Sequence, residues 1–177
     1  MKVVIPMSGQ SSRFTSAGYS TPKHLIEIDG KKVIEHIVNL YPKDSEFVFI
    51  INDKHAKETD VVEVLKKLVD DAVIITVPSH KKGPVHSVLK ASKYIGDDDP
   101  VVINYCDFSM DWDYNDFEEF VEQTECDGCV VCYTGFHPHM LGGDNYAFCK
   151  TEENKIVEIR EKQPFTADKM SEYASTG

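Results

Sequence analysis

The sequence has no long hydrophobic run. Its longest purely apolar stretch covers residues 47–51, far short of the roughly 20 residues needed to cross a bilayer. Near the N-terminus, Lys2 precedes a short apolar segment that Pro6 interrupts before it could form the core of a signal peptide. We therefore expect no membrane span and no secretory signal, and we predict a cytoplasmic protein.

Basic residues are scarce in the second part of the chain. The 177 residues have a formal net charge of −11, and residues 101–177 contain 16 of the 30 acids but only 5 of the 19 bases. Binding nucleic acid requires clustered Lys and Arg, so the composition argues against such a partner. Nine acids and no base lie between positions 107 and 127. This pattern favours a solvated helix face, with metal-binding carboxylates as the alternative.

Glycine, proline and cysteine are also few. Ten Gly and eight Pro beside 41% hydrophobic residues exclude a disordered or collagen-like chain and predict one globular unit. Five cysteines form an odd set without a secretory signal, so we expect free thiols and no disulfide. Cys126, Cys129 and Cys132 have the spacing of metal or iron–sulfur ligands. On a strand, Cys129 and Cys132 would point to opposite faces, which favours packed thiols over a cluster.

Apolar periodicity predicts alternating strands and helices in the first hundred residues. Such alternation is typical of a parallel sheet with right-handed crossovers, whose ligands bind beyond the C-terminal ends of the strands. The predicted strands are 2–7, 46–52, 72–77 and 100–104, and the predicted helices are 33–41, 54–69 and 84–95. After residue 113 we expect one acidic helix around residues 117–121, and then strands at 128–134, 146–150 and 155–159 in a mixed or antiparallel arrangement. The predicted fold class is α/β, with helices flanking a mixed, mostly parallel central sheet.

Two predicted loops carry residues suited to phosphate and metal. After the first strand, Gly9 and small hydroxyl residues would let backbone N–H groups approach a phosphate, and Arg13 and Lys23 would supply positive charge. After the fourth strand, Asp107 is placed to hold Mg²⁺ against phosphate oxygens, whereas Asp113 is better explained as a helix cap. Neither standard nucleotide fingerprint fits the first loop, so an ordinary surface loop stays an alternative.

These segments together resemble the sugar-phosphate nucleotidylyltransferase (NDP-sugar pyrophosphorylase, or NTP transferase) family. Its signature is a strand, a Gly-x-Gly-Ser/Thr-Arg loop and a Pro-Lys pair, which residues 3–7, Gly9–Arg13 and Pro22–Lys23 match. Residues 25–36 are similar to the family's continuation, Asp107 matches its metal-binding Asp, and Glu161, Lys162 and Pro164 resemble its Glu-Lys-Pro element. The resemblance implies a Rossmann-like, glycosyltransferase-A-like fold in a single nucleotidyltransferase domain over residues 1–177.

The resemblance also implies a reaction and a set of residue roles. An acceptor's phosphate oxygen attacks the α-phosphate of an NTP, transferring an NMP and releasing pyrophosphate, as in nucleotide-sugar synthesis for surface polysaccharides. Arg13 would hold the leaving pyrophosphate, Lys23 would stabilise the α-phosphate, and Asp107 would carry the cofactor Mg²⁺. The residues implied to border the nucleotide are Ser8, Gly9, Gln10, Ser11, Ser12, Gly83 and Pro84. The residues implied to contact the phosphorylated acceptor are Tyr146, Glu161 and Lys162.

The sequence departs from the family pattern at three places. Ser11 replaces the second glycine of the loop, which narrows the backbone conformations available there. Residues 82–86 replace the Gly-Thr-Ala that the family often has after the third strand. Residues 174–177 resemble the start of a further core strand, so we expect a shortened chain that lacks later elements and a second metal-binding Asp. An exposed sheet edge in such a chain would favour a homo-oligomer.

Two other readings remain. Asp111-Trp112-Asp113 is an Asp-x-Asp, the metal motif of nucleotide-sugar glycosyltransferases, although such enzymes have no use for the Arg13 and Lys23 block. The second alternative is a non-catalytic nucleotide-binding domain.

Overall fold

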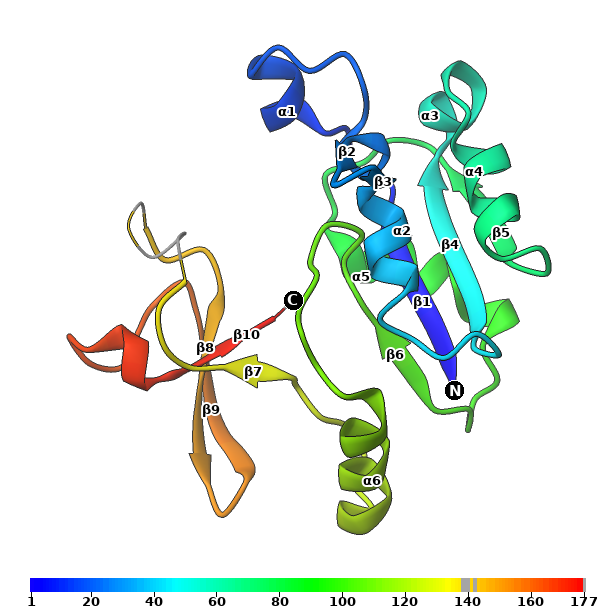
Figure 1. Ribbon diagram of the computed structural model, residues 1–177. Helices are drawn as coiled ribbons and strands as arrows, with labels where there is room; N and C mark the ends of the chain where they lie inside the picture. Colours follow the sequence, from blue (N-terminus) through cyan, green and yellow to red (C-terminus); the bar gives the residue numbers. More distant parts are fainter. Residues whose placement is uncertain (138–140, 142, 177) are drawn as a thin grey trace. The chain divides into compact units, whose positions relative to one another are not determined.

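The computed structural model describes residues 1–137, 141 and 143–176 (Figure 1). The chain divides into two compact units, which meet in sequence between Tyr114 and Asn115. The expectation of a single domain over residues 1–177 stays a prediction, and Gly177 itself lies outside the described residues. No helix in these described ranges is both long and apolar enough to span a membrane.

A parallel sheet of four strands forms the centre of the first unit. The strand order is β5-β4-β1-β6, and all three pairings are parallel. This arrangement confirms the predicted parallel sheet and brings the loops after β1, β4, β5 and β6 to the same edge. The strand bounds are β1 Lys2–Met7, β4 Glu46–Asn52, β5 Val73–Val77 and β6 Val101–Ile103.

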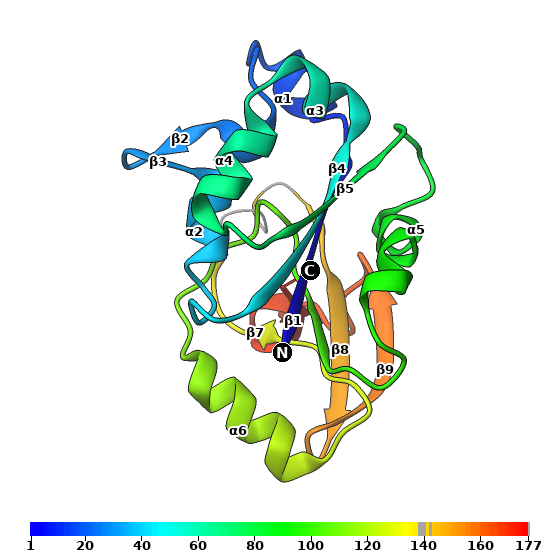
Figure 2. The same ribbon diagram turned by 90° about the vertical axis from the view of Figure 1, so that its right-hand side faces the viewer.

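Both faces of this sheet are covered, because side chains alternate along each strand. Val3, Ile5 and Met7 pack into one cluster with residues of α2 and α4, whereas Val4 packs into another with Val77 and Ala91. Figure 2 shows α2 and α4 on one side of the sheet and α5 on the other. The helices named here are α2 Val33–Val38, α4 Val61–Leu68 and α5 Pro84–Val88. Burial on both faces explains why β1 and β4 are near-continuous apolar runs.

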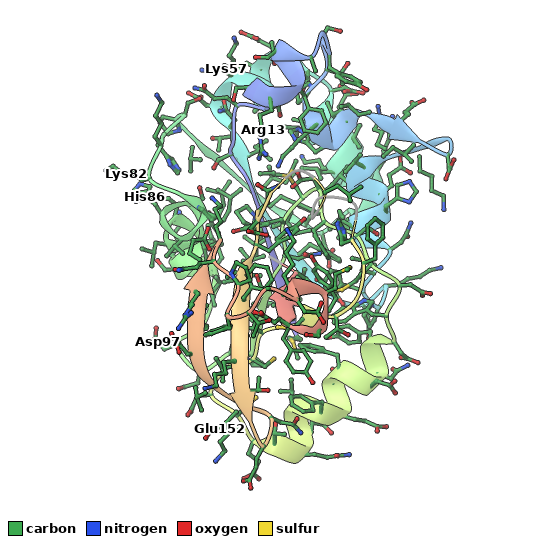
Figure 3. All side chains as sticks on the ribbon, turned by 90° about the vertical axis from the view of Figure 1, so that its left-hand side faces the viewer. Arg13, Lys57, Lys82, His86, Asp97 and Glu152 are labelled. Atoms are coloured by element: carbon green, nitrogen blue, oxygen red, sulfur yellow. The ribbon has the colours of Figure 1, made fainter. Side chains whose placement is uncertain are left out.

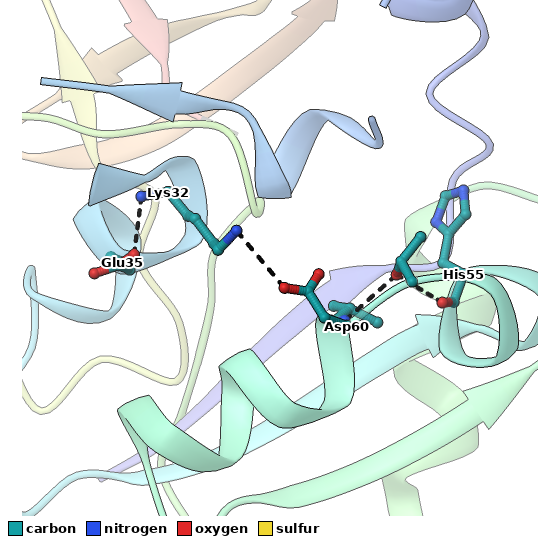
Figure 4. Close-up of polar contacts among 6 residues, drawn as sticks. Lys32, Glu35, His55 and Asp60 are labelled. Carbon is teal, nitrogen blue, oxygen red and sulfur yellow. Dashed lines mark hydrogen bonds and ion pairs between the residues drawn. The ribbon is translucent and has the colours of Figure 1, made fainter. Parts of the chain in front are cut away.

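The predicted helix over 54–69 is wrong in one respect: it is two helices, α3 Asp53–Glu58 and α4 Val61–Leu68. Thr59 ends α3, because its backbone N–H and its hydroxyl both donate to the His55 carbonyl, at 3.0 and 2.7 Å. Lys32 Nζ lies 3.8 Å from Asp60 Oδ2, which connects the start of α2 to the start of α4 (Figure 4).

The other helices of the first unit are shorter than predicted. Helix α2 ends at Val38 rather than near Tyr41, and the predicted helix over 84–95 is α5 followed by a 3₁₀ segment, η2 Leu89–Tyr94. Short elements that the sequence analysis did not predict are α1 Ser12–Ser16, η1 Lys23–Leu25, and the hairpin of β2 Glu27–Ile28 and β3 Lys31–Lys32. The acidic helix is confirmed as α6 Tyr114–Thr124.

The second unit contains an antiparallel sheet, one of the two arrangements that the sequence predicted for its strands. Its strand order is β7-β10-β8-β9. Its core holds Phe148 and Ala174, both fully buried, with Tyr133 and Phe165 packed against them. The segment predicted to begin a further strand forms β10, which pairs with both β7 and β8. The bounds are β7 Cys132–Tyr133, β8 Ala147–Glu152, β9 Lys155–Glu161 and β10 Tyr173–Ser175, with η4 Lys169–Ser171 before β10.

Candidate functional site

The loop after β1 is fixed by an unusual backbone conformation. Ser11 has φ of 54°, in the left-handed region where the family pattern has glycine, and it precedes α1 as its N-cap. The Ser11 hydroxyl accepts a hydrogen bond from the Lys23 backbone N–H at 3.2 Å. Gly9, Gln10 and Ser12 are exposed, whereas Ser8 is buried at the end of β1. The loop therefore presents its backbone to solvent while Ser11 holds the segment that carries Lys23.

Lys23 and Asp107 form an ion pair between two loops that are far apart in the sequence. Lys23 Nζ lies 2.7 Å from Asp107 Oδ1. Pro22 is buried, and η1 begins at Lys23, so the lysine backbone is anchored while its side chain reaches the loop after β6. The structure thus brings together the two residues predicted for the α-phosphate and the metal.

The pKa of Lys23 is set by opposing effects. Burial lowers this pKa, but Cys106 and Asp107 outweigh burial and hold the pKa above its ordinary value. Burial also raises the pKa of the Cys106 thiol to about 12, so this thiol is neutral at pH 7 and Asp107 supplies the negative charge. Lys23 is therefore a cation at neutral pH.

Arg13 is exposed on α1 and lies within electrostatic range of Lys23. Its positive charge lowers the pKa of Lys23, the reverse of the effect of Asp107. Figure 3 labels Arg13 on this part of the chain. Two cations and one carboxylate therefore border the loop after β1, an arrangement that can bind a polyphosphate carrying a divalent cation.

The turn before α5 brings Gly83 and Pro84 to the same edge of the sheet. Gly83 has φ of 85°, which favours glycine, and Pro84 occupies the first position of the helix, where its missing N–H costs nothing. The buried Ser87 of α5 lies against the β1 loop, because its Oγ is 2.6 Å from Ser8 Oγ. All residues predicted to border the nucleotide therefore lie at one edge of the first unit, in the segment from the end of β1 to the start of α1 or at the start of α5.

Sequence analysis missed several polar residues that hold these loops. Asn52, at the end of β4, donates from Nδ2 to the Ser8 carbonyl at 3.0 Å and to Ser79 Oγ at 2.6 Å. Its position directly after a buried apolar run, at a strand's C-terminal end, is the signal that could have identified it. His80 and Ser87 had no such signal, because neither stands in a recognisable motif.

His24 is a buried histidine beside Lys23. Its ring is 1% exposed and lies 5.5 Å, between centroids, from the ring of His55. Burial, then the charges of His55 and Lys23, lowers the pKa of His24 to about 3. Its Nε2 has no hydrogen-bond partner among the described residues. A neutral ring at this position adds no further positive charge next to the site.

The carboxylate available in the first unit fits a metal ion whose other ligands are phosphate oxygens and water. No group of three or more His, Cys, Asp or Glu side chains converges on a common point among the residues that the structure describes. Mg²⁺ commonly uses one or two protein carboxylates and completes its octahedral shell with phosphate oxygens and water. Asp107, exposed and beside two cations that attract phosphates, suits that mode of binding.

The residues predicted to contact the acceptor form a group of their own in the second unit. Ala147 pairs with Glu161 in the β8–β9 ladder, and the Lys162 N–H donates to the Tyr146 carbonyl at 3.1 Å. Lys162 has φ of 56° and its Nζ lies 3.4 Å from Glu161 Oε1. Tyr146, Glu161 and Lys162 are thus neighbours at one end of this hairpin.

The structure has a packed tryptophan and free thiols at the motifs behind the alternative hypotheses. Trp112 of the Asp-x-Asp donates from Nε1 to the Leu40 carbonyl at 3.1 Å and packs against Tyr41. All five cysteines are free thiols, and Cys106 and Cys149 are buried. Cys132 lies on β7 and Cys149 on β8, and burial, then the neighbouring Cys149 thiol, raises the pKa of Cys132 to about 12.

Comparison with known proteins places these features in one family. Residues 3–162 match the family model of the MobA-like NTP transferase domain. The bifunctional protein GlmU of Buchnera aphidicola subsp. Schizaphis graminum is 26% identical over 165 residues, covering 92% of this chain and 33% of that protein. A probable molybdenum cofactor guanylyltransferase of Bacillus cereus strain AH187 is 31% identical over 138 residues, covering 75% of this chain and 62% of that protein. The chain therefore spans less than two thirds of each of these relatives.

Solved structures show the same fold. A nucleoside-diphosphate-sugar pyrophosphorylase from Vibrio cholerae RC9 superposes with a TM-score of 0.71 at 25% identity, covering 98% of this chain and 72% of that one. A putative glucose-1-phosphate thymidylyltransferase from Bacillus anthracis has a TM-score of 0.74 at 22% identity, covering 99% and 69%. These similarities confirm the predicted Rossmann-like α/β class.

Proposed function

The chain belongs to the MobA-like NTP transferase family, and from this premise we propose that it is a nucleotidyltransferase. It would transfer an NMP from an NTP to a phosphorylated acceptor and release pyrophosphate. One oxygen of the acceptor phosphate attacks the α-phosphorus, and the bond from the α-phosphorus to the bridging oxygen of the β-phosphate breaks. The nucleophile is already an anion, so the protein needs no general base and acts by alignment and charge neutralisation.

The ion pair of Lys23 with Asp107, beside Arg13 and the β1 loop, is the observation that carries this proposal. Lys23 would turn from Asp107 to the α-phosphate, where negative charge increases during attack. Arg13 would hold the leaving pyrophosphate, and Ser8 to Ser12 with Gly83 and Pro84 would border the nucleotide. Asp107 would hold Mg²⁺, which supplies charge neutralisation at the phosphates when bound.

The acceptor is proposed to be a sugar phosphate or a similar phosphorylated metabolite. Support comes from the Tyr146, Glu161 and Lys162 group, which combines an aromatic ring, a carboxylate for hydroxyls and a cation for phosphate. The similar Vibrio cholerae protein is a nucleoside-diphosphate-sugar pyrophosphorylase, which agrees with this class. The product would then serve nucleotide-sugar and polysaccharide synthesis in the cytoplasm, where NTPs are available.

The test is to screen the full-length protein with four NTPs against sugar phosphates and other phosphorylated metabolites, including the molybdenum cofactor named in the Bacillus cereus relative. We expect pyrophosphate release that requires an NTP, Mg²⁺ and one acceptor together. Full-length Arg13→Ala and Lys23→Ala variants serve as inactive references. His36→Asn on α2, a substitution outside the proposed site, serves as the control that should keep wild-type activity.

Two outcomes would contradict this proposal. Transfer from a nucleotide sugar without pyrophosphate release would indicate a glycosyltransferase instead. Nucleotide binding without turnover against every acceptor in the panel would indicate a non-catalytic domain.

A further inference from the structure

One side chain, His80, closes the turn between β5 and α5. Its Nδ1 lies 3.2 Å from the Lys82 backbone nitrogen, and its Nε2 lies 2.9 Å from Ser87 Oγ. The ring therefore joins residues on the two sides of Gly83 and Pro84. An added Cβ at Gly83 would meet nothing within 4 Å, so packing does not hold the turn at that point. Hydrogen bonds on both sides of Gly83 and Pro84 therefore help to position this turn.

The hydrogen bonds at His80 have a defined direction. A backbone N–H can only donate, so Nδ1 of His80 accepts from Lys82, and the proton of the neutral ring is on Nε2. That Nε2–H then donates to Ser87 Oγ. The Ser87 hydroxyl proton is left for Ser8 Oγ, 2.6 Å away. This connected set, His80 to Ser87 to Ser8, links the turn before α5 directly to the loop after β1.

Asn52, at the end of a third strand, β4, is hydrogen-bonded to the same set. Asn52 donates both to the Ser8 carbonyl and to Ser79, the residue before His80, while its Oδ1 accepts from the Lys54 N–H at 2.8 Å. The last contact fixes which way the amide points, since a backbone N–H requires an oxygen. The ends of β1, β4 and β5 are therefore joined through side chains whose partners are 27 to 79 residues apart.

The surroundings of His80 are positively charged. His86 packs edge-on against it, with ring centroids 4.8 Å apart, and Figure 3 labels Lys82 and His86 near α5. Partial burial, then the charges of Lys82 and Lys90, lowers the pKa of His86.

We propose that His80 is a positioning residue for the nucleotide. By joining Lys82 to Ser87, and through Ser87 to Ser8, it sets the distance between the two loops that bracket the NTP. It therefore controls nucleotide affinity and discrimination among the four bases, and it leaves the chemical step to other groups. This inference rests on the proposed function, because it takes Ser8, Gly83 and Pro84 as the borders of the nucleotide.

The experiment compares single variants of the full-length protein. His80→Phe keeps a ring beside His86 but has no nitrogen, and Ser87→Ala removes the hydroxyl that His80 contacts. His80→Gln retains an amide that can donate toward Ser87 and is the conservative rescue. His36→Asn is the control, since the His36 ring nitrogen contacts the Ile28 carbonyl, at 2.9 Å, away from this set. Calorimetry gives Kd for each Mg·NTP, and pyrophosphate release gives KM and kcat.

We expect His80→Phe to raise Kd and KM for the preferred NTP about tenfold and to change kcat less than about threefold. The reason is that the substitution removes the hydrogen bonds of the His80 ring between uncharged groups, which connect Lys82 to Ser87. Preference among the NTPs should weaken, His80→Gln should recover part of the affinity, and His36→Asn should match the wild type. Ser87→Ala combined with His80→Phe should add little to either single change, because both break the same link.

The measurements on these variants distinguish failure of this inference from failure of the proposed function. A folded His80→Phe protein with wild-type Kd and base preference overturns this inference alone. Loss of kcat at unchanged Kd also overturns it, because the residue would then act on chemistry. Wild-type nucleotide binding without pyrophosphate release overturns the proposed function but leaves the Kd comparison valid. Absence of nucleotide binding by the wild type overturns both.

Discussion

His24 makes the stability of the protein depend on pH in a way that can be calculated. The folded protein holds this ring neutral, with a pKa of about 3, whereas the unfolded chain titrates near the ordinary value of 6.5. Below pH 6.5 the unfolded state therefore binds a proton that the folded state does not. Stability that is present above pH 6.5 is lost as the pH falls toward 3.

The size of this loss follows from the difference between the two pKa values. Each pKa unit corresponds to about 1.4 kcal/mol, so the complete effect approaches about 5 kcal/mol at very low pH. Between pH 7 and pH 5 the linkage relation gives a loss of about 2 kcal/mol from His24 alone. That is a large fraction of the stability of an ordinary domain.

Urea denaturation at pH 7 and pH 5 tests this calculation. The measured quantity is the free energy of unfolding of the wild type minus that of His24→Gln, because the contributions of other titrating groups largely cancel in that difference. We expect the difference to shift against the wild type by about 2 kcal/mol between pH 7 and pH 5. Leu25→Val, at the neighbouring buried position, controls for a loss of core packing that does not involve a titrating group. This variant should keep the wild-type dependence of stability on pH.

An unchanged difference at the two pH values would refute the reasoning, since it would mean that the folded protein admits a proton at His24. The test does not depend on the stability of His24→Gln, because the His24 ring of the wild type can also be titrated directly by NMR. The His24 resonances should then stay those of a neutral ring down to the pH at which the protein unfolds, and a titration near pH 6 would contradict the buried pKa.

Three further predictions concern the proposed reaction and its loop. Lys23→Ala and Arg13→Ala should each lower turnover about 10² to 10³-fold with folding intact, measured by pyrophosphate release and circular dichroism; full activity of either variant would remove its assigned role. Asp107→Asn should raise the Mg²⁺ concentration needed for half-maximal turnover, and an unchanged Mg²⁺ titration would exclude Asp107 as the ligand. Ser11→Ala should be less stable than Ser11→Gly by about 1 kcal/mol in urea, because only glycine relieves the left-handed conformation; equal stabilities would contradict strain at this position.

The central sheet could be predicted from the sequence because its strands are buried on both faces. The bounds predicted for β1 and β4 agree with the structure, since a continuous apolar run has few alternatives at that length. The break between α3 and α4 could not be read from apolar spacing, because the apolar residues at helical spacing lie in α4 alone and α3 has only Ala56. The hydrogen bonds of Thr59 to the His55 carbonyl decide where α3 ends. The β2–β3 hairpin did have a signal, the Asp29-Gly30 pair whose positive φ values form its turn, but strands of two residues show no periodicity.

Some residues of the candidate site could likewise be predicted from the sequence, and others could not. Lys23 and Asp107 could be predicted because each belongs to a family motif at a strand's end, and the fold then brings them into contact. Asn52 had a signal, its position at the C-terminal end of a buried strand, although its partner Ser8 lies 44 residues away in the sequence. His80 and Ser87 had none, because their roles depend on contacts that form only in the folded chain. A single sequence carries no record of such pairs until the chain has folded.

If Asp107 holds the metal and Lys23 the phosphate, as proposed, the contact between them makes substrate binding an exchange of partners. Each charge already neutralises the other in the structure, so a metal cation at Asp107 would compete with Lys23. A bare cation would leave Lys23 without a counter-ion, next to the repelling charge of Arg13. A triphosphate that arrives with its metal provides both new partners at once, a cation for Asp107 and an anion for Lys23. With the proposed roles, the ion pair would favour binding of the preformed metal–nucleotide complex over binding of either component alone.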